Sequence, residues 1–375
     1  RHLSQSELEN YCKHKKLIFK LPKGTKPEKR AKSFSEFLEK NQEAKKTAEI
    51  DFQEIKNIAN EKGSMMLFEY AKRTNQSTPD KEIDEMSSYD KAMWFFLNQR
   101  ETFDQVATEC EIENASGWML YKTKPFKETD ILGKEGELST EVKNYYYVSE
   151  LRGKICKVET ISKDDYICCV AYPQDYTSKY ATYEKSALNK NTILQPVFKI
   201  YFLCSPKEQR IGIKAQGGWK KREDLIKMFA KTVLGQTITS GDRIQFNLNK
   251  LKDFDFPFGT PPEDNVESVK VTSIKLSYPR AENRHITINV GNEGHGLKDI
   301  GKWITAHNIP IDQPNIAIAQ AKIRIKFKRS PLMPKRARGT VTALITAPSS
   351  CNLGVKPLQL KVKGYLKDWG IDTSE

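Results

Sequence analysis

The sequence lacks most of the residue patterns by which enzymes and metalloproteins are recognised. It has no Cys-x-x-Cys pair, and its five histidines complete no zinc-binding spacing. A Walker loop ending in Lys-Ser or Lys-Thr, a dinucleotide-binding fingerprint and a Gly-x-Ser-x-Gly elbow are also missing. We therefore expect no structural metal and no cofactor, and the sequence favours a protein without catalytic activity.

Long apolar runs are missing as well. No run approaches the roughly 20 residues that a membrane-spanning helix requires, so we expect no membrane partner. Most of the seven cysteines lie within apolar segments, as do Cys168 and Cys169 between Ile167 and Val170. This placement predicts buried, free thiols in a reducing compartment, cytoplasmic or otherwise intracellular.

Positive charge is abundant, with a net charge of +14, and it is unevenly distributed. Residues 1–32 contain 10 lysines and arginines against 3 acidic residues, and residues 151–375 contain 37 against 21. Residues 33–150 between them are acidic, with 15 basic against 24 acidic residues. Such a distribution bears on the partners of a protein rather than on its fold.

The pattern of apolar residues divides the chain into three parts. The Lys-rich residues 1–32, with prolines and a glycine, predict a basic flexible arm. Helical spacing predicts a helical domain over residues 33–140. Strand patterns then predict a basic, β-rich body over residues 141–375, with a division near residue 240 as an alternative.

We therefore expect an α+β fold, in which an acidic all-helical N-terminal domain precedes a basic, β-rich α+β body. A barrel is the alternative for that body. The strands that we expect lie at residues 144–148, 154–160, 166–172, 197–204, 210–216, 243–248, 266–278, 284–290, 316–328 and 339–347. Two helices are expected among them, at residues 221–234 and 297–307.

The most distinctive segment is a basic run that begins at residue 322. Cationic and apolar residues alternate there, which predicts a strand whose successive side chains face opposite sides. Ile323, Ile325 and Phe327 would face the core, and the cations would repeat on the other face at roughly 6.6–6.8 Å, close to the phosphate spacing of an extended single strand. The candidate phosphate contacts are Lys322, Arg324, Lys326, Lys328, Arg329, Lys335, Arg336 and Arg338.

Three interpretations of this basic run are open. A nucleic-acid interface would contact phosphates with low sequence specificity, on DNA or RNA, single- or double-stranded. A solvated outer face would instead take carboxylates from a neighbouring strand. The third interpretation is a membrane surface, although no basic amphipathic helix with exposed apolar residues accompanies the run.

Two further groups extend the nucleic-acid hypothesis. Lys220, Lys221 and Arg222 follow a Gly-Gly pair and open a predicted helix, whose first backbone N–H groups suit a phosphate. An ordinary turn that leads into a helix is the alternative for this group. The second group is a series of tyrosines near Lys179 and Lys185, namely Tyr166, Tyr172, Tyr176, Tyr180 and Tyr183. Exposed aromatic rings beside cations stack unpaired bases, whereas rings in strands also pack into cores.

One glycine-rich loop allows a catalytic interpretation. Glu293 and His295 stand among three glycines ahead of a predicted helix, and His295 would serve as a general base. An ordinary connector between strand and helix is the alternative. We thus expect a non-catalytic nucleic-acid-binding subunit, with another protein subunit as a further partner. The alternatives are a protein-interaction subunit of a larger complex, and a hydrolase or nuclease with a site near Glu293 and His295.

Overall fold

The chain folds into two units, which divide between Glu111 and Ile112 within one helix. The computed structural model describes residues 2–79, 86–163, 165–184, 187–278, 284–291, 294–328 and 339–373. Described residues up to Glu111 form the first unit, and those from Ile112 onward form the second. The sequence predicts domain boundaries at residues 32 and 140. The division in the structure lies between these two positions.

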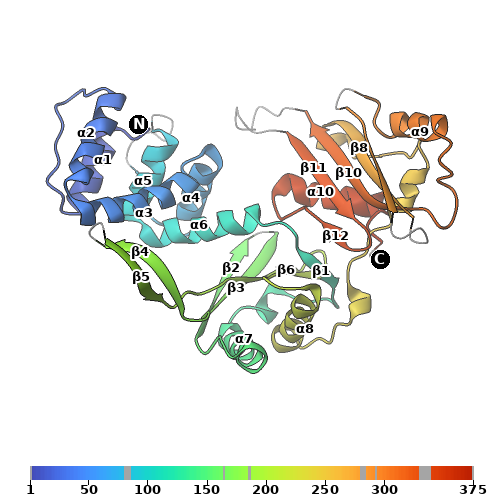
Figure 1. The fold of residues 1–375 in the computed structure, drawn as a ribbon, viewed down its shortest axis with the longest axis horizontal. Coiled ribbons are helices and arrows are strands. Elements are labelled where there is room, and N and C mark those ends of the chain that lie inside the picture. Colours follow the sequence, from blue (N-terminus) through green and yellow to red (C-terminus); the bar gives the residue numbers. More distant parts are fainter. Residues whose placement is uncertain are drawn as a thin grey trace. The chain divides into compact units, whose positions relative to one another are not determined.

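The first unit is helical, as the sequence predicts (Figure 1). Its helices are α1 (Gln5–His14), α2 (Pro27–Glu39), α3 (Gln42–Ile58), α4 (Glu61–Arg73), α5 (Ser88–Asn98) and α6 (Arg100–Asn114). Four of these begin after a serine or asparagine whose side-chain oxygen accepts a backbone N–H of the first turn. Their apolar stripes meet in one core that contains Ile55, Leu67 and Phe95, all fully buried.

The predicted flexible arm contains ordered structure. Helix α1 lies within residues 1–32 and buries Leu8, Tyr11 and Cys12, which are spaced three and four residues apart on one helix face. The Tyr11 hydroxyl donates to Asp51 at 2.8 Å, and the Lys15 ammonium lies 2.7 Å from the same carboxylate. Burial and the Asp51 charge raise the pKa of Tyr11. The many lysines obscure this short apolar stripe, which is why the sequence suggests a flexible arm.

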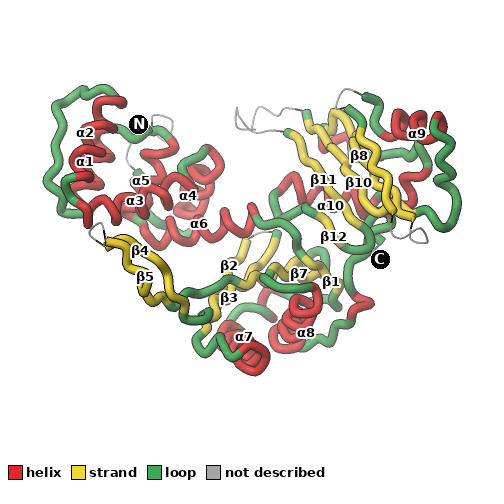
Figure 2. The backbone as a smooth tube through the Cα atoms, in the orientation of Figure 1, coloured by secondary structure: helices red, strands yellow, loops and turns green. Residues whose placement is uncertain are grey.

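The second unit contains two open antiparallel sheets and one separate hairpin (Figure 2). Its first sheet has the strand order β1-β7-β6-β3-β2. These strands are β1 (Met119–Lys122), β2 (Cys156–Lys163), β3 (Tyr166–Pro173), β6 (Ile200–Ser205) and β7 (Arg210–Lys214). Helices α7 (Glu135–Glu150) and α8 (Trp219–Leu234) cover one face, and their core includes Phe202 stacked on Phe229 at 4.7 Å between ring centroids.

Helix α7 corrects the prediction of a strand at residues 144–148. Leu138, Val142 and Tyr146 repeat every four residues and are buried against the first sheet. Consecutive tyrosines favour strands locally, but this helical stripe gains more apolar burial than a strand would at the same place. The separate hairpin, β4 (Ser178–Glu184) and β5 (Ala187–Leu194), is not among the predicted elements.

The second sheet has the order β12-β11-β10-β8-β9. Its strands are β8 (Val266–Tyr278), β9 (Arg284–Asn289), β10 (Ala317–Phe327), β11 (Thr340–Thr346) and β12 (Ser350–Cys351). Helices α9 (Leu297–Ala306) and α10 (Pro357–Asp368) share one core with one face of this sheet (Figure 1). Short 3-10 helices complete the unit at η2 (Glu128–Asp130), η3 (Ser240–Asp242), η4 (Leu248–Lys252) and η5 (Pro262–Asp264).

The architecture is therefore mixed α+β, with a helical N-terminal region. Neither five-stranded sheet closes on itself, so the barrel alternative finds no support in the described residues. The predicted strand at residues 243–248 forms only isolated bridges, from Arg243 to Tyr121 and from Phe246 to Asp372. In the part of the chain that the structure describes, no helix combines the length and the apolar character needed to cross a membrane.

Helix α10 buries a lysine. Lys363 is only 8% exposed, and its ammonium forms no hydrogen bond or ion pair with the described residues. It shares a cavity of about 20 Å³ with Arg210 of β7, whose guanidinium lies 3.0 Å from Asp372. Burial lowers the pKa of Lys363, and the nearby carboxylate of Glu208 opposes this only in part. The ammonium therefore costs stability in the folded chain.

We expect Lys363→Met to raise the free energy of unfolding at pH 7 by on the order of 1 kcal/mol, because it removes a buried charge and keeps the apolar stem. The pKa of Lys363 is lower in the folded than in the unfolded chain, so the unfolded chain binds more protons between those two values. Wild-type stability therefore rises with pH across that window, and the advantage of the variant shrinks towards pH 10.5. Urea unfolding at several pH values measures this.

Lys361→Met serves as the control on the same helix, because Lys361 pairs with Asp264 at an exposed position. Its effect should be within about 0.5 kcal/mol. A loss of stability in Lys363→Met would show instead that the attraction of Glu208 and Asp372 for the ammonium exceeds its desolvation cost.

Candidate functional site

Strand β10 presents its cations on one face of the second sheet. Ile323, Ile325 and Phe327 are buried in the core, and the residues between them are exposed or half-exposed, so the predicted strand and its alternation are confirmed. The strand lies between β11 and β8, and Arg324 faces Thr342 on one side and Lys270 on the other. Pairing on both sides therefore fixes which side chains point away from the core.

Cross-strand register shows which residues share this outer face. Its rows run Thr346–Gln320–Lys275–Thr287, then Leu344–Lys322–Ser273–Asn289, then Thr342–Arg324–Lys270, and last Thr340–Lys326–Ser268. A hydrogen bond of 2.8 Å from the Gln320 amide to the Thr346 hydroxyl confirms that the first row lies on one side. We call this surface the cationic sheet face, and its cations are Lys270, Lys275, Lys322, Arg324 and Lys326.

Sequence reasoning missed two of these five cations, Lys270 and Lys275 of β8. They stand beside Arg324 and Gln320 only through the pairing of β8 with β10. None of the five side chains is buried. The remaining residues of the face are mainly hydroxyl and amide side chains, which also bind phosphate oxygens.

The cations of the cationic sheet face differ in their ion pairing among the residues that the structure describes. Glu267 lies 2.6 Å from the Lys326 ammonium, so the interpretation as a solvated face with acidic neighbours holds for Lys326. Lys275, Lys322 and Arg324 form no ion pair with any described residue. These three side chains therefore carry positive charge that no described carboxylate pairs with.

The other predicted phosphate contacts of this run lie beyond β10. Lys328 is exposed, and its backbone N–H donates to the Asn265 carbonyl oxygen at 2.8 Å. The four remaining residues, Arg329, Lys335, Arg336 and Arg338, lie outside the described residues.

The three basic residues at the start of α8 point in different directions, because consecutive residues of a helix lie on different sides of it. Lys220 is exposed, whereas Lys221 points inward, pairs with Glu150 and lies 4.7 Å from the centre of the Tyr146 ring. Arg222 is half-buried beside Tyr121, which its charge influences. The structure thus places Lys221 and Arg222 mainly in intramolecular contacts, and only Lys220 of this group faces solvent freely.

The five tyrosines fall into two classes. Tyr166 is buried and Tyr172 is half-buried, both in β3 of the first sheet, so strand packing explains them. Tyr176, Tyr180 and Tyr183 are exposed, at the root of or within the β4–β5 hairpin. Lys185 lies outside the described residues.

The predicted catalytic loop is described only in part. Glu293 lies outside the described residues. His295 is exposed, and its backbone N–H donates to the Asp299 carboxylate at 2.6 Å, which caps the start of α9. This contact explains Asp299 as a helix-capping residue, and no ion pair joins the His295 ring to an acid among the described residues.

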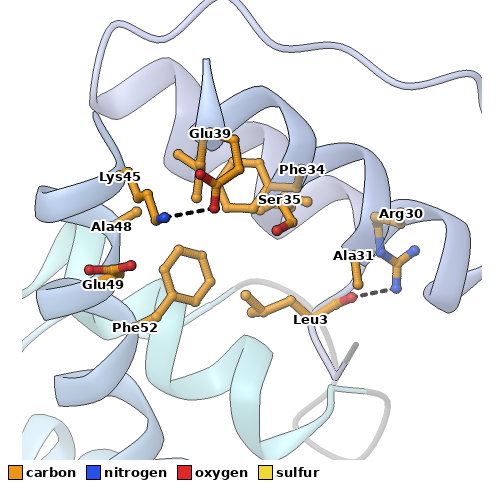
Figure 3. A pocket seen from close by; sticks show the side chains of 12 residues that line it. Leu3, Arg30, Ala31, Phe34, Ser35, Glu39, Lys45, Ala48, Glu49 and Phe52 are labelled. Atoms are coloured by element: carbon orange, nitrogen blue, oxygen red, sulfur yellow. Dashed lines mark hydrogen bonds and ion pairs between the residues drawn. The ribbon is translucent and has the colours of Figure 1, made fainter. Parts of the chain in front are cut away.

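The first unit contains an apolar cavity of about 340 Å³ between α2, α3 and the segment around Leu3 (Figure 3). Phe34 and Phe52 form its walls. The cations at its edge are engaged, since Lys45 pairs with Glu39 at 2.6 Å and Arg30 donates to the Leu3 carbonyl oxygen. The cavity is therefore an apolar groove, and the two cations at its edge are bound to groups of the first unit itself.

No protein-family model matches the chain, and no curated protein matches it. The cationic sheet face therefore has to be interpreted from its own chemistry.

The two faces of β10 should respond differently to truncation. We expect Ile325→Ala to lower the free energy of unfolding by about 2–5 kcal/mol, because Ile325 is fully buried and its loss leaves a cavity. Lys326→Ala, one residue away, should change stability by less than about 0.5 kcal/mol. Urea denaturation followed by circular dichroism tests both, and equal losses would contradict the assignment of core and outer faces.

Proposed function

We propose that the chain binds nucleic acid through its phosphate backbone, with the cationic sheet face as the contact surface. The supporting observation is the gathering of Lys270, Lys275, Lys322, Arg324 and Lys326 on one open sheet face, where Lys275, Lys322 and Arg324 form no ion pair with the described residues. A polyanion binds such a surface by releasing its counterions. Contacts of this kind position a nucleic acid without selecting its sequence.

The geometry of the strand suits a linear polyanion better than a single small anion. Alternate residues of β10 repeat at roughly 6.6 Å, and neighbouring strands stand roughly 4.8 Å apart, so the cations form a grid rather than a pocket. The hydroxyl of Thr342 and the amide of Gln320 add uncharged donors within the same rows. A chain of phosphates thus meets several cations at once.

The apolar groove of the first unit favours a second candidate function, protein interaction. Phe34, Phe52 and Leu38 line this groove on helices, which suits an amphipathic helix of another subunit. Phe52→Asp would then abolish assembly with that subunit and leave nucleic-acid binding unchanged.

The triple variant Lys275→Ala, Lys322→Ala, Arg324→Ala should weaken binding and flatten its salt dependence. Each of these cations lacks a carboxylate partner among the described residues, so each is available to a phosphate. The slope of log K against log salt concentration should fall by up to roughly 2.7, at about 0.9 for each phosphate that is no longer neutralised. Fluorescence anisotropy with labelled single-stranded DNA, duplex DNA and RNA across a salt series measures this.

A matched control removes the same charge elsewhere. Lys29, Lys40 and Lys72 are exposed lysines of the first unit, and their replacement by alanine lowers the net charge equally. For this control variant, the slope of log K against log salt concentration should stay close to that of the wild type. Equal slopes for both triple variants would show that binding depends on total charge and would remove the cationic sheet face as the contact surface.

A second variant should act in the opposite direction. Glu267→Gln removes the carboxylate that pairs with Lys326 at 2.6 Å, so it frees one cation and removes one repulsive charge. We expect tighter binding at low salt and a slope steeper by roughly one. Unchanged binding in the same anisotropy assay would place Lys326 outside the contact surface.

A further inference from the structure

We infer that the β4–β5 hairpin is an aromatic wedge that stacks the unpaired bases of a nucleic acid on Tyr180 and Tyr183, one on each of its two faces. This inference rests on the proposed function for its class of ligand, but it concerns a different surface from the cationic sheet face. It predicts a forked ligand, in which one separated strand passes along each face of the hairpin.

The hairpin stands apart from the sheets of its own unit. Strands β4 and β5 pair only with each other among the described residues, and no described side chain from Ser178 to Leu194 is buried (Figure 2). A lone two-stranded hairpin is marginally stable in water, because it has no core of its own. This one nevertheless exposes large rings, with Tyr183 at 72% and Tyr180 at 44%. Such exposure is typical of a binding element.

The strand register assigns the two rings to opposite faces. Tyr183 pairs with Leu188, and its face also holds the Lys179–Ile193 pair. Tyr180 pairs with Thr192 on the other face, where a hydrogen bond joins the hydroxyls of Thr182 and Thr192 at 2.5 Å. Each face therefore offers one exposed ring, beside Leu188 on one face and Thr192 on the other, on which a base can stack.

Several contacts hold the root of the hairpin, so the projecting part has a fixed direction. Arg152 pairs with Asp175 and with Glu150, and its guanidinium lies 4.2 Å from the centre of the Phe198 ring. The same guanidinium lies 5.1 Å from the Tyr176 ring, whose hydroxyl donates to the Glu150 carbonyl oxygen. These contacts join both ends of the hairpin to the C-terminus of α7.

Charge and polarity favour nucleic acid over an apolar protein surface. From Tyr176 to Lys199 the sequence contains four lysines and one glutamate, interspersed with Ser, Thr, Asn and Gln. This excess of positive charge complements phosphates, and the aliphatic side chains resemble the apolar wedges that other proteins insert between bases. The side chains that separate bases thus stand beside those that attract phosphates.

The experiment compares a fork, a single strand and a duplex of matched length, labelled for anisotropy and carrying 2-aminopurine next to the junction. The wild type should bind the fork most tightly, and stacking should quench the 2-aminopurine fluorescence. Tyr180→Ala and Tyr183→Ala should each weaken fork binding at least about 5-fold, the low end of the range for removing one base–aromatic stack. The double variant should lose the preference for the fork.

Two controls separate stacking from other roles. Tyr180→Phe and Tyr183→Phe keep the rings and should bind as the wild type does. Tyr147→Ala removes an exposed tyrosine of α7 outside the hairpin and should also leave binding unchanged. If the alanine variants of the hairpin bind and quench like the wild type, the inference is wrong, and the exposed rings belong to a protein interface instead.

The outcomes also distinguish this inference from the proposed function. Binding that depends on Lys275, Lys322 and Arg324 but not on the hairpin tyrosines would retain the proposed function and overturn the wedge. A wild type that binds none of the three ligands at physiological salt would overturn both.

Discussion

The pairing of β10 in the middle of the second sheet is the constraint on which the candidate surface depends. Pairing with β11 and β8 on both sides makes the side chains of β10 alternate, and the apolar core takes up Ile323, Ile325 and Phe327. A slip of one residue would bury Lys322, Arg324 and Lys326 and expose their apolar neighbours. The hydrophobic core thus sets the direction of every cation on the strand, and their spacing follows from the backbone.

The sequence predicts this strand closely and the whole face only in part. Alternation identifies β10 because its apolar residues stand at every second position. In β8 the buried residues follow spacings of two and three, since the pairing with β10 shifts at several bulges. No simple period therefore shows that Lys270 and Lys275 share the outer face. That information lies in the pairing of strands, which a single sequence does not contain.

Other differences between expectation and structure have equally local causes. The tyrosines at residues 145–147 favour a strand, but Leu138, Val142 and Tyr146 complete a helical stripe whose burial prevails. The β4–β5 hairpin escaped prediction because it buries no face, so its apolar residues show no regular period. Helix α1 was obscured in the same way, since only a few of its side chains enter the core and a lysine-rich segment follows it.

The two basic runs of the chain show why charge must be interpreted together with secondary structure. In a strand, alternate residues share a face, so the cations of β10 stay together. In a helix, consecutive residues point about 100° apart, so Lys220, Lys221 and Arg222 diverge. Lys221 then meets Glu150 and Tyr146 inside the fold. A run of basic residues therefore predicts a basic surface only when the spacing of its cations matches the side-chain period of the strand or helix that contains it.

The energetics of the cationic sheet face indicate that folding does not require it. Two cations about 6.6 Å apart repel by about 0.6 kcal/mol in water, and salt reduces this further. The fold tolerates that cost, but it gains nothing from cations there, since uncharged β-formers would satisfy the same strand. Buried Arg210 differs, because the loss of Asp372 would leave its charge buried without this partner. Because the stability of the fold does not account for these five neighbouring cations, we propose that they serve a polyanionic ligand.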